Sequence, residues 1–333
     1  MGHLMVDRRR LVGAFTCALF AFSFDVKAQR PERVWRIGYL AQGTAALDRP
    51  YTQALRQGLR DLGWIEGQNI QIDERFADGK TERLPALAAE LVRAKVDVVV
   101  TWSTPAALAA KHATATIPIV IGFAADPVAT GIVTNLAHPG GNITGWTHIG
   151  LELRAKYLEL LKDAVPEAVR VGVLWNPKNQ VHKPSLKVID TAAQRLSVQI
   201  HLAGVQDANE LEAAFSTFVA ERVQALIVFP DGMFIAQMPL ILSLAARSRL
   251  PALYGVREYV EAGGLMFYGA DLSAMQRYVG ASIVDKILKG SHPADLPVEQ
   301  PTKFELVINL NTAKSLGLTI PQSVLLRADE VIQ

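Results

Sequence analysis

Hydrophobic residues follow two alternating patterns along most of the chain, short apolar runs and longer stretches with helical spacing. Residues 96–100 and 118–123 are apolar runs, which are typical of strands covered on both faces of a parallel sheet. Between them, 83–94 and 105–114 carry apolar residues at the spacing of one helical face. Such alternation of strands and helices predicts an α/β fold with parallel sheets.

The same succession occurs twice. Five strands are predicted at 35–40, 69–76, 96–100, 118–123 and 143–146, and five more at 169–175, 198–205, 225–229, 251–254 and 265–268. A last long helix is predicted at 273–288, and a late strand at 304–310. Two series of five strands predict two similar lobes, each a doubly wound parallel sheet, with a ligand cleft between them.

The chain is expected to cross between these lobes near 147–150 and again near Asp271. One lobe is then built from 34–147 and 272–292, and the other from 148–271 and 293–331. Several crossings of this kind predict a hinge of several segments.

The first 28 residues differ from the rest. Arginines at 8–10 precede an apolar run without charge at 11–24, and the segment VKA at 26–28 follows, with small residues at the positions that a signal peptidase recognises. This is the layout of a secretory signal peptide, and the run is shorter than the roughly 20 residues that a membrane-spanning helix needs. We predict export to the periplasm, cleavage near Ala28 and no transmembrane span in the mature chain. A membrane anchor or a buried helix is the alternative.

The mature chain predicted in this way has no net formal charge. Four of the 34 basic residues and two of the 32 acidic residues lie within 1–28, which leaves 30 of each sign. Without a basic surplus, binding to nucleic acid is not expected. The single cysteine, Cys17, lies in the same segment, so the mature chain has no disulfide, thiolate metal site or cysteine nucleophile.

Polar and aromatic side chains directly follow many of the predicted strands. Ligands of open α/β sheets bind beyond the carboxyl ends of the strands, so these side chains are candidates for ligand binding. The candidates are Gln42, Trp102, Ser103, Thr104, Asp126 and Trp146 in the first lobe, and Asn176, Asp231, Tyr254 and Asp271 in the second.

Four of these candidates have two interpretations. Ser103 and Thr104 precede a predicted helix, whose free N–H groups can bind a ligand carboxylate or can be capped by the two side chains themselves. Asp231 and Asp271 end two strands, where a buried carboxylate needs a partner such as a ligand ammonium. A turn or a helix cap is the alternative for each.

Four other candidates also have a ligand-binding and a structural interpretation. Trp102, Trp146 and Tyr254 can cover an apolar or ring-shaped ligand, or can pack in the core. Asp126 precedes a proline, which favours a structural turn.

Familiar catalytic signatures are missing. Residues 38–43 read GYLAQG where a dinucleotide-binding fold has Gly-x-Gly-x-x-Gly, and neither a Walker A sequence nor Gly-x-Ser-x-Gly occurs. The histidines show no paired spacing typical of metal ligands. We expect no enzyme, no metal and no cofactor. A hydrolase on a Rossmann-like scaffold stays an alternative, because catalytic acids can be distant in sequence.

Several segments together resemble a known family. They are RDLGWIEGQNI at 60–70, ATIPIV at 115–120, DPV at 126–128, HPGGNITG at 138–145, EAGGLM at 261–266, LPVEQP at 296–301 and LGLTIP at 316–321. Over 35–331 the chain resembles the ABC-transporter substrate-binding proteins, a family that includes tryptophan- and tyrosine-binding members.

This resemblance implies a type I periplasmic-binding fold with a hinge of three segments and a ligand between two lobes. It also implies a partner permease and ATPase, no catalysis by this chain, and a small polar or zwitterionic ligand such as an aromatic amino acid. We expect a monomer. Ser103 and Thr104 would hold the carboxylate of the ligand, and Asp231 and Asp271 its ammonium. Trp102 stands where a small residue is expected. A periplasmic sensor subunit is the alternative function.

Overall fold

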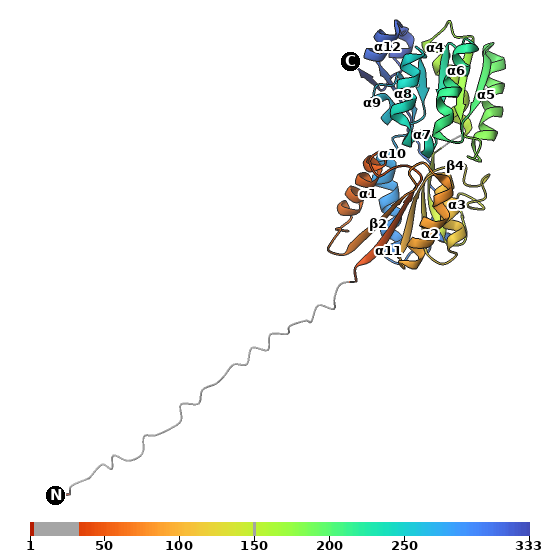
Figure 1. Cartoon of the computed structure of the whole chain (residues 1–333). Coiled ribbons are helices and arrows are strands. Elements are labelled where there is room, and N and C mark those ends of the chain that lie inside the picture. The colour runs from red at the N-terminus through yellow and green to blue at the C-terminus, as the bar shows by residue number, and fades with distance from the viewer. Residues whose placement is uncertain (3–32, 149–150) are drawn as a thin grey trace. The chain divides into compact units, whose positions relative to one another are not determined.

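The computed structural model describes residues 1–2, 33–148 and 151–333. The predicted signal peptide at 1–28, with Cys17, lies outside these residues apart from its first two positions, and so do residues 149–150 of the first predicted crossing. Val34–Gln333 form one compact unit, which contains two sheets with helices packed around each (Figure 1).

The first sheet has five parallel strands in the order β2–β1–β3–β4–β5. β3 and β4 are buried along their whole length, which explains their continuous apolar sequences. The sequence predicts all five strands to within two residues. They are β1 (Trp35–Ala41), β2 (Ile70–Phe76), β3 (Val98–Trp102), β4 (Ile119–Ala125) and β5 (Ile143–His148).

The helices of the first sheet lie between its strands in the chain. α1 has Pro50 in its first turn, where a missing N–H is harmless, and buries Leu55 and Leu59. The helices are α1 (Arg49–Asp61), the short 3₁₀ helix η1 (Thr81–Arg83), α2 (Leu84–Arg93) and α3 (Thr104–Ala113).

The second sheet has seven strands in the order β12–β11–β10–β9–β8–β6–β7. Its strands are β6 (Arg170–Trp175), β7 (Gln199–Gly204), β8 (Ala225–Val228), β9 (Ala252–Tyr254), β10 (Met266–Gly269), β11 (Glu305–Asn309) and β12 (Glu330–Ile332). β11 runs antiparallel to β10, and the other neighbours are parallel.

The expectation of five strands in this sheet is wrong. β11, the predicted late strand, joins the same sheet, and β12 extends it by one more strand. β12 has only three residues, paired with Val307–Asn309, and a segment of that length carries no hydrophobic period that a sequence pattern can detect.

Apart from the first, which precedes β6, the helices of the second sheet also lie between its strands in the chain. They are α4 (Leu151–Ala164), α5 (His182–Leu196), η2 (Ala208–Glu210), α6 (Leu211–Ala220), α7 (Gly232–Ala236), α8 (Met238–Arg247), α9 (Glu258–Glu261), α12 (Leu310–Leu316) and α13 (Gln322–Leu325).

After β10 the chain returns to the first sheet. The single helix predicted at 273–288 is divided into α10 (Leu272–Ala274), a π-helical turn η3 (Met275–Gly280) and α11 (Ala281–Leu288). These elements pack on α1 so closely that a Cβ on Gly58 would lie 2.0 Å from the carbonyl oxygen of Arg277.

The chain then crosses back beside β5. After the short helix η4 (Pro293–Asp295), the Glu299 amide donates to the Gly145 carbonyl, and the Thr147 amide donates to the Glu299 carbonyl, each at 2.9 Å. The segment that leads into β11 therefore extends the edge of the first sheet before it enters the second.

Candidate ligand-binding site

The loops at the carboxyl ends of the two sheets contact each other. Gln42 follows β1 of the first sheet, and Gly232 opens α7 after β8 of the second. A Cβ placed on Gly232 would lie 2.6 Å from the Gln42 side-chain oxygen, so only glycine fits at this contact. Gln42 is fully buried, and its amide nitrogen donates to the Thr81 hydroxyl at 2.7 Å. Its side-chain oxygen has no hydrogen-bond partner.

Four rings form a continuous stack along the edge of the first sheet. Tyr51 stacks on Trp102 with ring centroids 4.1 Å apart, Trp102 on Phe123 at 5.5 Å, and Phe123 on His148 at 4.8 Å. All four are buried, and the indole N–H of Trp102 has no acceptor. This aromatic stack fills the edge at which ligands of α/β sheets bind.

The backbone at the same edge is strained. Ser103, Phe123 and Asp126 have φ values of 126°, 49° and 38°, in a region that residues with a Cβ rarely adopt. Such conformations persist only where the surroundings enforce them, and they gather at functional sites.

The start of α3 satisfies most of its own donors. Ser103 Oγ accepts the Ala106 N–H at 3.2 Å, and Pro105 has no N–H. Thr104 Oγ1 accepts the Ala125 N–H at 3.1 Å. The capping role that the sequence allows for Ser103 is therefore present, and it leaves few N–H groups for a ligand.

Asp231 lies at the centre of a buried polar cluster in the second lobe. Its Oδ1 accepts from Asn176 Nδ2 at 3.1 Å and from the Met233 N–H at 2.9 Å, and its Oδ2 accepts from Asn179 Nδ2 at 2.9 Å. Asn176 and Asp231 are thus brought together as the strand-end rule predicts. Asn179 joins them from three residues further along the loop.

His182 fixes the loop that carries Asn176. Its Nδ1 accepts the Asn176 N–H at 2.8 Å, so its Nε2 carries the proton and donates to the Pro230 carbonyl at 3.0 Å. Burial lowers the pKa of His182 to about 4, against the opposing effect of the Asp231 charge. The imidazole is therefore neutral at physiological pH.

Arg154 is the residue of this region that the sequence analysis missed. It lies on α4, is 1% exposed, and its guanidinium stacks over the rings of Tyr157 and Phe229 at 4.9 and 4.7 Å. Its Nε and Nη1 have no hydrogen-bond partner, and no ion pair joins it to a described carboxylate. Burial lowers its pKa.

A signal for Arg154 exists in the sequence. It stands four residues before Leu158 and seven before Leu161, both fully buried, so it occupies the apolar face of its own helix. His148 lies near enough to feel its charge. Burial, followed by the charge of Arg154, lowers the pKa of His148 to about 3.

The remaining candidates lie apart from this cluster. Trp146 donates to the Gln276 side-chain oxygen at 3.2 Å and packs edge-on against Trp102. Tyr254 stacks on Tyr259 with centroids 4.4 Å apart. Both rings therefore belong to packed cores as the structure stands.

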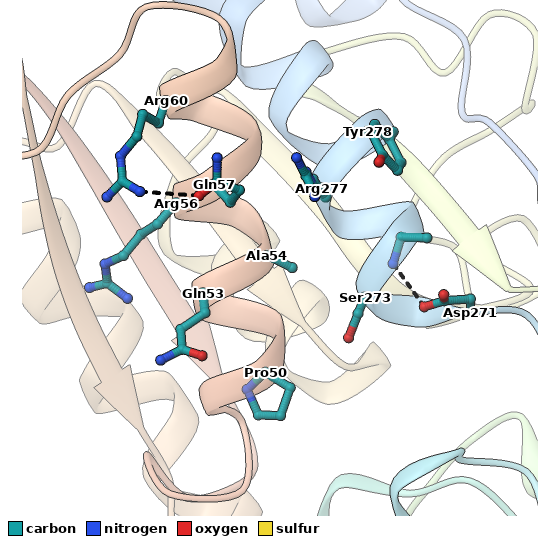
Figure 2. A pocket seen from close by; sticks show the side chains of 11 residues that line it. Pro50, Gln53, Ala54, Arg56, Gln57, Arg60, Asp271, Ser273, Arg277 and Tyr278 are labelled. Atoms are coloured by element: carbon teal, nitrogen blue, oxygen red, sulfur yellow. Dashed lines mark hydrogen bonds between the residues drawn. The ribbon is translucent and has the colours of Figure 1, made fainter.

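Asp126 and Asp271 each accept a local backbone N–H. Asp126 Oδ1 bonds the Ala129 N–H at 3.0 Å within a turn, and Asp271 Oδ1 caps α10 through the Ala274 N–H at 2.8 Å. Figure 2 shows Asp271 at one end of a groove between α1 and the helical segment formed by α10 and η3. Their roles in ligand binding stay predictions.

The described residues contain neither a membrane-spanning helix nor a cluster of metal-binding side chains. None of the helices in 33–148 and 151–333 has the length and apolar character to cross a membrane. Within the same ranges, no group of three or more His, Cys, Asp or Glu side chains could hold a metal ion.

Known proteins resemble this chain over most of its length. A curated tyrosine-binding protein of Clostridioides difficile is 29% identical over 263 residues, which cover 79% of this chain and 75% of the relative. A structure from Streptococcus pneumoniae in complex with L-Trp superposes with a TM-score of 0.83 at 27% identity and covers 90% of this chain and 100% of its own.

A third relative is a ligand-free, open structure of a substrate-binding protein with adhesive properties from Clostridium difficile. Its identity is also 27% and its coverage is the same, but its TM-score is 0.63. The family model described as ABC transporter substrate binding protein matches residues 45–332. This chain belongs to the family of ABC transporter substrate-binding proteins, with the type I periplasmic-binding fold.

Proposed function

We propose that this chain is the periplasmic binding subunit of an ABC importer and that it closes two lobes around a small aromatic solute. Its partners are the permease and the ATPase of the transporter, to which it delivers the solute unchanged, as a monomer. The relatives that bind tyrosine and L-Trp support a ligand of this size and shape.

The two lobes are 34–147 with 272–292 and 148–271 with 293–331. The packing of α10, η3 and α11 on α1 supports the assignment of 272–292 to the first lobe. The pairing of Glu299 with Gly145 and Thr147 supports a crossing back to the second lobe beside β5.

One observation carries the proposal. Buried polar atoms without partners occur at strand ends of both lobes: the Gln42 oxygen after β1, the Trp102 N–H at the end of β3, and the Arg154 guanidinium over Phe229, which follows β8. Unsatisfied buried polar groups are costly in a folded protein, so a ligand that satisfies them favours the closed arrangement. The closer superposition on the L-Trp complex than on the open, ligand-free relative supports a closed arrangement of this chain.

In this proposal the aromatic stack forms an apolar wall, and Gln42, Asn176 and Asp231 supply or position polar contacts. Ser103 and Thr104 shape the wall from the start of α3, and Trp102 narrows the space beside it. Binding shifts the population from an open to a closed form, which the membrane partner recognises.

The test is calorimetry of the mature protein with aromatic amino acids and with aromatic acids and amines of the same carbon frame. Small-angle X-ray scattering before and after addition of a bound compound measures closure, and NMR of the recovered compound checks that it is unchanged. Binding with closure and without turnover is expected. If no compound of this panel binds, or if the bound compound is converted, the proposal is wrong.

A further inference from the structure

Arg154 is a buried cation without a counter-ion among the described residues. Its aromatic neighbours, Tyr157 and Phe229, offer ring faces, and the polar side chain of Tyr157 also favours the charged guanidinium, but neither residue is a carboxylate. Arg154 and His148 interact electrostatically, and both groups are cations when protonated. An arginine keeps its charge at every physiological pH, so protonation cannot relieve the cost of burying it.

The acid in the neighbourhood of Arg154 is Asp231, and it has other partners. Asp231 and Arg154 both interact electrostatically with His182, but the two oxygens of Asp231 already accept three hydrogen bonds from Asn176, Asn179 and Met233. No ion pair between the two is formed. The guanidinium therefore retains two unsatisfied nitrogens, Nε and Nη1, and guanidinium N–H groups are strong donors to a carboxylate.

The start of α3 is a weaker candidate for binding the ligand carboxylate than Arg154. The start of α3 has lost the Ala106 N–H to Ser103 Oγ and has no N–H at Pro105. It offers a partial dipole charge, whereas Arg154 offers a full charge in a dry environment.

We infer that Arg154 binds the carboxylate of the ligand and that the solute is an aromatic carboxylate with net negative charge rather than a zwitterionic amino acid. This inference rests on the proposed function. A monoanion neutralises Arg154, whereas the ammonium of an amino acid lies beside its carboxylate and needs a free acid near Arg154, where both oxygens of Asp231 are already hydrogen-bonded. The buried acids whose oxygens lack partners, Asp48 and Glu258, lie instead beside Tyr51, at the end of the aromatic stack opposite His148.

Three compounds that share one ring and side chain separate the charges. The first series is 3-(4-hydroxyphenyl)propionate, L-tyrosine and tyramine, which are an acid, an amino acid and an amine. The second series is indole-3-propionate, L-tryptophan and tryptamine, in the same order. In calorimetry at low and moderate salt we expect one of the two acids to bind at least about tenfold more tightly than its amino acid, and neither amine to bind.

Tighter binding of the amino acid than of the acid, or binding of an amine, overturns the inference and leaves the proposed function intact. If no compound of either series binds, the proposed function fails and the inference falls with it.

Arg154→Met tests the residue itself. It keeps the length of the side chain and removes the charge, and we expect the affinity for the bound acid to fall about 30-fold or more. The Tm of the ligand-free variant should not fall, since replacing an unpaired buried charge by an apolar group is often neutral or stabilising. Arg154→Lys, which keeps the charge without the fork, should bind with intermediate affinity.

Arg195→Met is the matched control. Arg195 lies on α5 with 66% of its side chain exposed, so the variant removes one positive charge from the surface and should bind normally. Full affinity in Arg154→Met overturns the inference. A lowered Tm in Arg154→Met together with unchanged affinity in Arg154→Lys also overturns it, because arginine would then be structural.

Discussion

Asn179 donates its side-chain amide to Asp231 Oδ2 over 2.9 Å, and both residues are almost entirely buried. Asn176 and the Met233 N–H complete the set of donors on the other carboxylate oxygen. Asp231 therefore joins the loop after β6 to the start of α7, where Gly232 contacts Gln42 of the first sheet.

Asp231→Ala leaves three buried donors without their acceptor. We expect the free energy of unfolding to fall by about 1–3 kcal/mol, because a buried donor that loses its acceptor is not hydrated in compensation. Urea unfolding followed by tryptophan fluorescence measures this change. Asp207→Ala is the control, since Asp207 caps η2 at the surface through one hydrogen bond of 3.5 Å. Equal losses in the two variants would contradict the structural role of Asp231.

Trp102 connects three other rings, Tyr51, Phe123 and Trp146. Trp102→Ala should lower the free energy of unfolding by about 3–5 kcal/mol, through lost burial and the cavity left behind. Trp102→Phe keeps part of the stack and should lose less. A loss below about 1 kcal/mol for the alanine variant would mean that the stack is not tightly packed.

The stability of the protein should depend on pH through Asp48. Asp48 is 1% exposed, and burial, followed by the charge of Glu258, raises its pKa to about 8. Burial also raises the pKa of Glu258, and Tyr39 and Tyr51 interact with Asp48. The folded protein therefore retains a proton that the unfolded chain releases near pH 4, so stability decreases as pH rises from about 4 to about 8.

The window for the measurement is pH 6.5 to 8. Below it, His148 and His182, whose pKa values are lowered to about 3 and about 4, act in the opposite direction, since they must gain protons on unfolding. Within it we expect the free energy of unfolding to fall by at most about 1.4 kcal/mol per pH unit and per proton. Asp48→Asn should flatten this slope and raise stability at pH 8. An unchanged slope in this variant would exclude Asp48 as the source.

One variant, measured for stability and for ligand affinity, can decide whether Asp271 only caps α10 or also binds the ligand. As the cap of α10, Asp271→Ala should lower the free energy of unfolding by about 1 kcal/mol and leave ligand affinity unchanged. Asp271→Ser should retain the cap. If calorimetry instead shows a loss of about 2–5 kcal/mol in binding, the carboxylate pairs with a ligand ammonium.

The sequence predicts what depends on local pattern. Apolar runs and helical spacing locate the strands of the first sheet, and the ends of strands point to Gln42, Asn176 and Asp231, which meet at the facing loops. Gln42 and Asn176 follow a strand directly and Asp231 comes three residues after β8, so finding the strand is enough to find the residue.

Features that depend on neighbours distant in the chain were not predicted. Arg154 lies on the apolar face of its helix, which the sequence indicates, but its contact with Phe229 on another element and the lack of a described counter-ion are visible only in the structure. Asn179 follows its strand by four residues, and its partner Asp231 lies 52 positions away. The division of the last long helix at η3 likewise follows from its packing on α1 rather than from its own composition.

Trp64, just after α1, donates its indole N–H to Asp285 on α11 at 2.8 Å, and 221 positions separate the two residues. During synthesis, the side of α1 that receives α11 therefore stays uncovered until nearly the entire polypeptide has left the ribosome. The amino-terminal half cannot mature on its own and wait for the remainder. A nascent chain with such a late closing contact exposes apolar surface for longer and is more prone to associate with other chains.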